Sequence, residues 1–160
     1  MAIGVALPET SLVIDTDVFT DWRYRKEHIV KEINAYMSRA KKPPALTAMN
    51  VFEALYGFEN KAVKNGGLDE RTALDRNATE RLISSCIVLP FNDDAASIAA
   101  YLFPRLSKSQ RNRHSTDLFI AATALAHGYG IATRNITDFE LIAKTLPSDR
   151  FLRLALWKSN

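Results

Sequence analysis

Four carboxylate side chains stand beside apolar segments of this 160-residue chain. Asp15, Glu53 and Asp138 each follow a short apolar run, and Asp117 opens an alanine-rich stretch. If the runs are strands of a parallel sheet, these acids lie at its carboxyl edge, where such sheets bind ligands. Carboxylates gathered without lysine repel one another unless a cation lies among them, and all-oxygen ligand sets are typical of Mg²⁺ or Mn²⁺. Metal-dependent hydrolysis of a phosphodiester is the reaction class that this pattern indicates.

Each of these acids also has a purely structural interpretation. Asp15 and Asp138 are suited to cap a helix, because a carboxylate accepts from free backbone N–H groups there. Asp117 is placed to interact favourably with the positive end of the helix dipole in the alanine-rich stretch that follows it. Taken singly, the acids are therefore weak signals, and the argument for chemistry depends on their convergence at one sheet edge.

The segment around Glu53 adds a second feature. Asn50 is predicted to cap a helix that has Glu53 in its first turn, where the dipole favours an acid. Gly57 follows Glu53 by one helical turn. A glycine at this spacing leaves the surface beside the carboxylate open to a close-approaching group.

Short apolar runs alternate with helical patterns along the chain, and strands this apolar are covered on both faces. The spacing therefore predicts a three-layer α/β/α sandwich with a mostly parallel sheet of about five strands. The predicted strands are 12–14, 45–47, 87–89, 130–133 and 151–154. The predicted helices are 26–40, 50–64, 68–85, 92–109, the stretch after Asp117 that ends at Gly128, and a short one over 139–144.

Length and composition set the outer bounds. One domain over 1–160 is expected, with residues 1–11 as an N-terminal extension of unassigned role. Hydrophobic residues make up 47% and charged residues 24% of the chain, which excludes a disordered protein. The single cysteine, Cys86, fits a reducing cytoplasm, and we expect no membrane segment and no cleaved signal peptide. The formal charge of +3 is compatible with nucleic acid without indicating it.

The four acid-bearing segments together resemble the motifs of PIN-domain proteins. These segments are 12–18, 50–57, 117–124 and 132–139, in that order along the chain. Within that family, the chain looks like a VapC-type toxin of a bacterial type II toxin–antitoxin pair. The resemblance covers roughly residues 10–157, and it implies a PIN-like fold.

The resemblance also implies an activity and its residues. It implies a Mg²⁺-dependent (or Mn²⁺-dependent) endoribonuclease that is held inactive by a cognate antitoxin and is usually a homodimer in the cytoplasm. Asp15, Glu53 and Asp117 match the three acids of the family motif, with Asp15 and Asp117 as direct metal ligands. Asp138 is assigned as the fourth acid, and Asn135 as a polar contact to metal-bound water or substrate.

Asp17 departs from the family pattern, because it stands where the family commonly has Asn. The extra carboxylate there supports metal binding or merely caps the helix.

Two further sets of residues are predicted to bind partners. Arg111 and Arg113 lie in an acid-free basic stretch, interpreted as a polar loop leading to Asp117, and are predicted to hold RNA phosphates. Thr133, at the end of a strand, is predicted to contact substrate together with Asn135. Segments 26–40 and 50–64 carry the aromatic residues Tyr36, Tyr56 and Phe58, which either form a groove for the antitoxin or pack the core.

Two alternatives stay open at this point. The first is a catalytically inactive PIN-fold protein that binds RNA, and the retained acids favour the enzyme over it. The second is a phosphatase of the haloacid-dehalogenase type, since Asp15-Thr16-Asp17 after a strand is similar to that motif. The phosphatase motif continues with Gly-Thr, whereas this chain continues with Val18-Phe19.

Overall fold

The fold is described by a computed structural model that covers residues 3–5 and 10–158. These residues form a six-stranded sheet in which every pairing is parallel, with the spatial order β1-β6-β5-β2-β3-β4. The strands are β1 (Ile3–Val5), β2 (Leu12–Ile14), β3 (Ala45–Thr47), β4 (Ile87–Leu89), β5 (Gly130–Thr133) and β6 (Leu152–Leu156).

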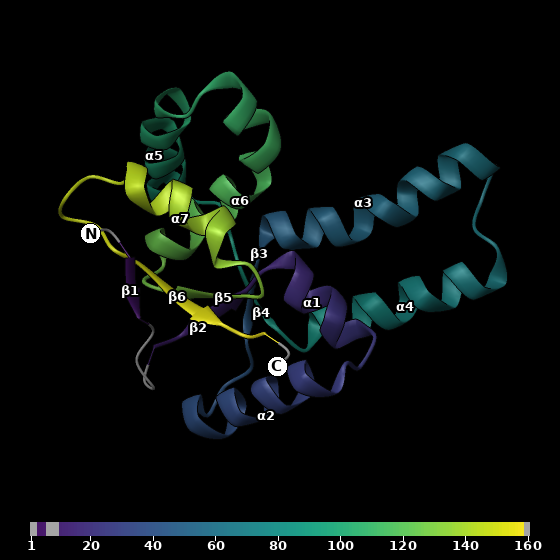
Figure 1. Cartoon of the computed structure of the whole chain (residues 1–160). Helices are drawn as coiled ribbons and strands as arrows, with labels where there is room; N and C mark the ends of the chain where they lie inside the picture. Colours follow the sequence, from purple (N-terminus) through teal and green to yellow (C-terminus); the bar gives the residue numbers. More distant parts are fainter. Residues whose placement is uncertain (1–2, 6–9, 159–160) are drawn as a thin grey trace.

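Helices cover both faces of this sheet, as Figure 1 shows. They are α1 (Thr16–Arg23), α2 (Glu27–Ala40), α3 (Ala48–Asn65), α4 (Glu70–Ser84), α5 (Asp93–Leu102), α6 (Lys108–Ala126) and α7 (Ile136–Thr145). A short 3-10 turn, η1 (Phe103–Arg105), follows α5. In the described part of the chain, no helix is long and apolar enough to cross a bilayer. The predicted three-layer α/β/α fold with a parallel sheet is confirmed.

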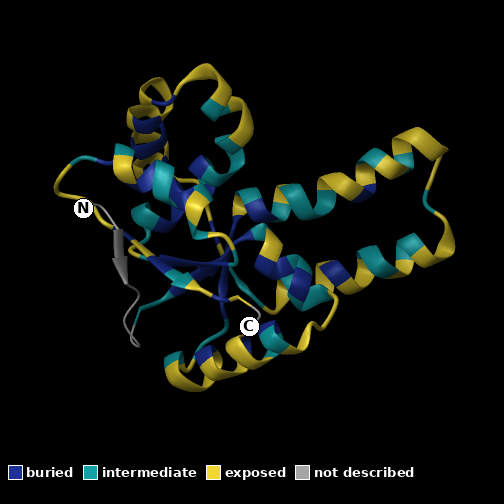
Figure 2. Cartoon of the chain, viewed as in Figure 1, coloured by how far each residue is buried: buried dark blue, intermediate teal, exposed yellow. Residues whose placement is uncertain are grey.

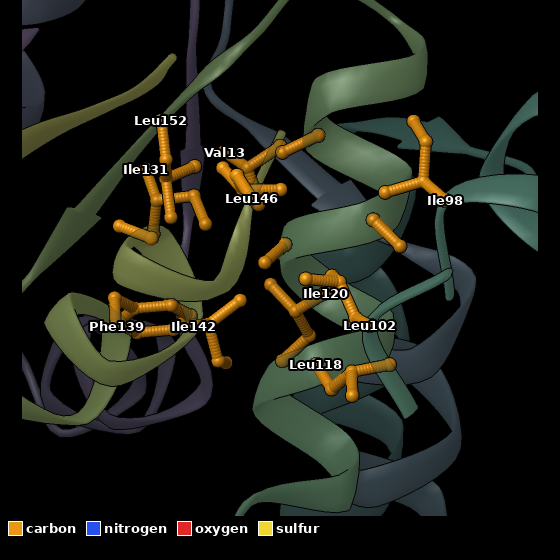
Figure 3. Close-up of a cluster of buried hydrophobic side chains, with 14 of the residues drawn as sticks. Val13, Ile98, Leu102, Leu118, Ile120, Ile131, Phe139, Ile142, Leu146 and Leu152 are labelled. Carbon is orange, nitrogen blue, oxygen red and sulfur yellow. The ribbon is translucent and has the colours of Figure 1, made fainter. Parts of the chain in front are cut away.

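The two faces of the sheet bury separate clusters because successive side chains of a strand point in opposite directions. In β2, Val13 packs toward α5, α6 and α7, whereas Leu12 and Ile14 pack toward α1 and α2. Figure 3 shows the first cluster, in which Ile131 of β5 lies beside Leu152 of β6, and Phe139 lies beside Ile142 of α7. Burial on both faces explains why the strands are uninterrupted apolar runs.

The pair of helices α3 and α4 extends away from the sheet (Figure 1). Most of the distal residues of this pair are exposed, as Figure 2 shows. An ion pair between Glu59 and Arg76 links the two helices. Their near ends lie beside α1, so the pair forms one wall of the region that follows β2 and β3.

The chain adds strands first on one side of β2, with β3 and β4, and then on its other side, with β5 and β6. The order of the strands therefore reverses at β2. The register aligns Ile14 with Ala132, and the backbone N–H of Asp15 donates to the Ala132 carbonyl at 3.0 Å. The ends of β2 and β5 are therefore held together at the point where parallel sheets of this kind bind ligands.

The sheet differs from the sequence prediction at one edge. We predicted about five strands and assigned no role to residues 1–11. Residues 3–5 of that segment form β1, which pairs with β6 through Ile3 and Leu152. The last strand is also shifted by one to two residues from the predicted 151–154. A short edge strand such as β1 depends on pairing with a distant segment, which local hydrophobicity does not reveal.

The predicted polar loop before Asp117 is wrong, because α6 already begins at Lys108. The side chain of Ser107 accepts from the Gln110 N–H, and the Gln110 side chain accepts from the Ser107 N–H, which is a capping box. Backbone angles at His114 (φ −119°, ψ 17°) kink the helix before Asp117. Asp117 lies three residues beyond this kink, in the first turn of the helical segment that continues to Ala126, as the sequence predicted.

The start of the helix that carries Glu53 also differs from the prediction. Thr47 caps α3, and Asn50 is the third residue of that capping box rather than the cap itself. Glu53 therefore lies in the second turn, beyond the strongest influence of the helix dipole. Likewise, α7 begins at Ile136 with Asn135 as its cap, so Asp138 lies in its first turn rather than at the cap.

Candidate active site

Asp15 lies at the end of β2, where it is also the N-cap of α1. One carboxylate oxygen accepts from the Val18 N–H at 2.8 Å, and the other accepts from the Thr133 hydroxyl at 2.5 Å. The residue is only 6% exposed. The pKa of Asp15 is raised to about 7, chiefly by burial; the two hydrogen bonds lower it, and the charges of Asp17 and Asp117 add to the rise. Asp15 therefore caps α1 and is at the same time a candidate site residue.

Glu53 reaches the same region from α3. It accepts a hydrogen bond from the Thr16 hydroxyl at 2.5 Å, and Thr16 in turn accepts from the Asn50 side-chain amide at 3.1 Å. Partial burial raises the pKa of Glu53, and the charges of Asp117 and Asp17 act in the same direction. Thr16, which the sequence analysis did not single out, therefore ties Glu53 to the residue next to Asp15.

Asp117 enters from α6, just beyond the kink at His114. The His114 Nδ1 lies 3.3 Å from Asp117 Oδ2. Burial raises the pKa of Asp117, the contact with His114 lowers it, and the charges of Asp138 and Asp17 raise it. The kink places an imidazole against this acid, a contact that the scattered histidines of the sequence gave no reason to expect.

Asp138 is held by its own neighbour in the chain. The Asn135 side-chain amide donates to Asp138 Oδ2 at 3.0 Å, while Asn135 Oδ1 accepts from the Thr137 N–H to cap α7. The Asn135 N–H donates to the Thr133 hydroxyl at 3.0 Å. A continuous chain of hydrogen bonds therefore runs from Asp138 to Asp15.

The structure brings the four predicted acids, together with Asp17, to one edge of the sheet. Asp117 raises the pKa of both Asp15 and Glu53, and Asp138 raises that of Asp117. Within residues 3–5 and 10–158, however, no three acidic, histidine or cysteine side chains are close enough to enclose a metal ion as they stand. The donor set is nevertheless all carboxylate oxygen, which is the chemistry that a hard divalent cation prefers.

Arg134 compensates one side of this acidic group. Its guanidinium lies 2.9 Å from Asp21 Oδ2 and 3.6 Å from Asp17 Oδ2. Asp21 is buried and also pairs with Lys26 at 2.9 Å. Sequence reasoning missed this network, because Arg134 and Asp21 are separated by more than a hundred residues and carry no local pattern.

Comparison with known proteins bears directly on this arrangement. A model of the PIN domain matches residues 12–144. A VapC ribonuclease of Sinorhizobium fredii is 31% identical over 134 residues, which is 81% of this chain and 90% of that protein. The chain belongs to the PIN-domain family. The prediction of a nuclease agrees with the name of this relative.

Solved structures agree on the PIN fold. The VapBC2 structure from Rickettsia felis, bound to a DNA fragment from its promoter, superposes with a TM-score of 0.70 at 16% identity and covers 91% of this chain and 98% of that chain. VapBC-5 of Mycobacterium tuberculosis, a member of a toxin–antitoxin family, gives 0.60 at 23% identity, with 92% and 98% coverage. Membership of the PIN family leaves no role for the phosphatase alternative.

Of the predicted RNA-binding residues, Arg113 lies near the acids, Arg111 packs on an aromatic ring and Thr133 is buried. Arg113 lines a cavity of about 370 Å³ together with His114 and Asp138. Arg111 instead lies over the Phe103 ring, 5.5 Å from its centroid. Thr133 is fully buried, and its hydroxyl is directed at Asp15 rather than at the surface.

The predicted aromatic groove for a partner is wrong for two of its three residues. Tyr36 is completely buried, where its hydroxyl accepts from the Leu12 N–H, and Phe58 is 4% exposed. Tyr56 is 56% exposed. An amphipathic helix buries one stripe, and the sequence did not show which aromatic residues belong to it. A cavity of about 730 Å³ lies instead between α1, α2 and α4.

Proposed function

We propose that this PIN-domain protein is a metal-dependent endoribonuclease that acts as the toxin of a toxin–antitoxin pair. The observation that carries the proposal is the convergence of Asp15, Glu53, Asp117 and Asp138 from four separate elements, with pKa values raised by burial in the first three. Buried carboxylates that repel one another are costly without a cation, so their collection at one sheet edge supports a metal site.

Mg²⁺ or Mn²⁺ would be held by Asp15 and Asp117, with Glu53 and Asp138 completing the site or holding water. Such an ion supplies an activated water and compensates the charge that develops on the phosphoryl group. The residues around the acids orient them: Thr133 fixes Asp15, and the remaining contacts come from Thr16, His114 and Asn135. Fixed orientation of ligands by hydrogen bonds is the usual supporting arrangement at metal sites.

RNA cleavage by the purified protein is the direct test. The wild-type protein should cleave RNA in Mg²⁺, and EDTA should abolish cleavage reversibly. Asp15→Asn and Asp117→Asn should fold but lose cleavage, because each removes a charge with little change in volume. Asp94→Asn, an exposed acid in the first turn of α5, is the matched control. A protein that binds RNA without cleaving it would favour the catalytically inactive alternative instead.

We further propose that the partner is a cognate antitoxin, since the PIN-domain neighbours named above belong to VapBC assemblies. The groove between α1, α2 and α4 fits a peptide segment, because it combines the apolar side chains of Trp22, Val30 and Leu82 with charged groups along its edges. A homodimer remains a prediction.

Co-expression tests the groove. Val30→Arg should fill it and weaken neutralisation of growth arrest by the antitoxin, whereas Asn34→Arg, exposed on the same helix, should not. Equal neutralisation of both variants would move the antitoxin to another surface.

A further inference from the structure

Another cavity opens directly beside Glu53, and the metal chemistry proposed above does not use it. It has a volume of about 190 Å³ and lies between α1, α3 and α4. Its lining includes Thr16 and Thr20 of α1, Tyr24 at the C-terminal cap of that helix, and Glu53, Gly57 and Lys61 of α3. Because Glu53 borders both this cavity and the acidic group, a molecule in the cavity lies next to the proposed site of cleavage. We refer to it as the Gly57 cavity.

Gly57 itself has no role in the packing of the protein. It lies in the interior of α3, where glycine weakens a helix relative to alanine. A Cβ atom built at Gly57 would meet no atom within 4 Å apart from its chain neighbours and the backbone of its own helix. Gly57 is also absent from the residues of positive φ. The backbone therefore does not require glycine here, and its effect is to leave the cavity wall flat beside Glu53.

The charges around the cavity are balanced rather than basic. Arg23 and Asp75, which both line it, form an ion pair at 2.9 Å. Lys61 is exposed at one end, and Glu53 is the second acid. Two cations and two acids do not make a general anion site, so a free phosphate or an acidic peptide is a poor match.

The remaining lining groups suit a nucleoside. Thr16 and Thr20 provide hydroxyl groups. Tyr24 is 63% exposed, with the Arg23 guanidinium 5.4 Å from its ring centroid. An exposed aromatic ring provides a stacking surface for a base, and hydroxyls and a lysine contact ribose and phosphate oxygens.

We propose that the Gly57 cavity binds the nucleoside adjacent to the scissile phosphodiester of a single-stranded RNA. The base stacks on Tyr24, the sugar–phosphate backbone passes over Gly57, and Lys61 contacts the neighbouring phosphate. This inference rests on the proposed ribonuclease function and extends it to a binding site on the Glu53 side of the acids, separate from Arg111 and Arg113.

The test enlarges Gly57 without disturbing the fold. Gly57→Leu fills the cavity wall, and Val63→Leu, at an exposed position on the same helix, is the matched control. Both should melt at or above the wild-type temperature, because leucine is a better helix former than glycine and no worse than valine. Affinity for a short labelled single-stranded RNA, measured in EDTA, should fall about tenfold in Gly57→Leu, with kcat/KM for cleavage falling in parallel, and neither should change in Val63→Leu.

Tyr24 provides the second arm. Tyr24→Ala should weaken RNA binding by about tenfold, whereas Tyr24→Phe should retain it, because stacking needs the ring and not the hydroxyl. If Gly57→Leu binds RNA with wild-type affinity, the proposed nucleoside site is wrong. The same holds if this variant loses only its neutralisation by the antitoxin. Failure of the wild-type protein to cleave RNA, combined with Gly57-dependent binding, would overturn the ribonuclease function and leave the nucleoside site standing.

Discussion

The hydroxyl of Thr133 donates to Asp15 Oδ2 at 2.5 Å, joining residues that are 118 positions apart in the chain. The contact depends on the pairing of β2 with β5, which aligns Ile14 with Ala132 immediately before the two residues. With one oxygen bound by Thr133 and the other by the Val18 N–H, the Asp15 carboxylate is fixed before any ligand arrives.

Removal of the Thr133 hydroxyl should therefore affect chemistry more than folding. Thr133→Val should lower RNA cleavage by about 10- to 100-fold, as loss of a group that orients a metal ligand commonly does. In the wild-type protein, the hydrogen bond from Thr133 lowers the pKa of Asp15. Its removal should raise this pKa, so the pH profile of cleavage should shift to higher pH. Thr133→Ser, which keeps the hydroxyl, should retain most activity. An unchanged pH profile in Thr133→Val would show that the hydroxyl does not act through Asp15.

The raised pKa of Asp15 predicts how stability depends on pH in EDTA. Burial holds this pKa at about 7, above its value in the unfolded chain, so the folded state binds the proton more tightly. Asp15 therefore does not lower the free energy of unfolding below about pH 4. Between about pH 4 and pH 7 it lowers this free energy progressively, and above about pH 7 the loss is complete. The melting temperature should fall as the pH rises through this window, and Glu53 and Asp117 act in the same direction.

Two controls separate this effect from general pH sensitivity. In Asp15→Asn the melting temperature should fall less as the pH rises. This variant should be more stable than the wild type at about pH 8, since each pKa unit corresponds to about 1.4 kcal/mol. Mg²⁺ or Mn²⁺ should raise the wild-type melting temperature at the same pH, by binding the folded state alone. A wild-type melting temperature indifferent to both pH and metal would contradict the assignment of Asp15.

The ion pair between Arg134 and Asp21 should contribute to stability. Arg134→Met should cost roughly 1 to 3 kcal/mol in urea unfolding, because it leaves buried Asp21 with a weaker set of partners. Lys26→Met is the comparison, since Lys26 pairs with the same carboxylate from a more exposed position. Its cost should stay below about 1 kcal/mol. If the two variants lose the same free energy of unfolding, the more buried position of the Arg134 guanidinium does not contribute to stability.

The basic segment of α6 should contact RNA phosphates. An Arg111→Ala/Arg113→Ala double variant should bind RNA more weakly and lower the salt dependence by roughly 0.7 per lost contact on a log–log plot. Because Arg113 shares a cavity with Asp138 whereas Arg111 packs on Phe103, most of the loss should appear in Arg113→Ala alone. Arg81→Ala, exposed on α4, is the charge-matched control. An unaltered salt slope in the double variant would return this segment to an ordinary solvated surface.

The sequence by itself determined the fold class and predicted which acids would gather at one edge of the sheet. The runs around Val13, Leu46 and Ile131 are apolar because each strand is buried on both faces, and that property is visible locally. Asp15, Glu53, Asp117 and Asp138 stand in fixed positions relative to these runs, so their order along the chain was enough to suggest one site.

Tertiary structure decided what holds those acids and which aromatic residues are buried. Thr133 reaches Asp15, and Arg134 reaches Asp21, only after strand order places the end of β5 beside the end of β2. Tyr36 was indistinguishable from an exposed tyrosine until packing chose the buried stripe of α2. Contacts between distant segments depend on register and on helix rotation about its axis, and neither is encoded in the spacing of nearby residues.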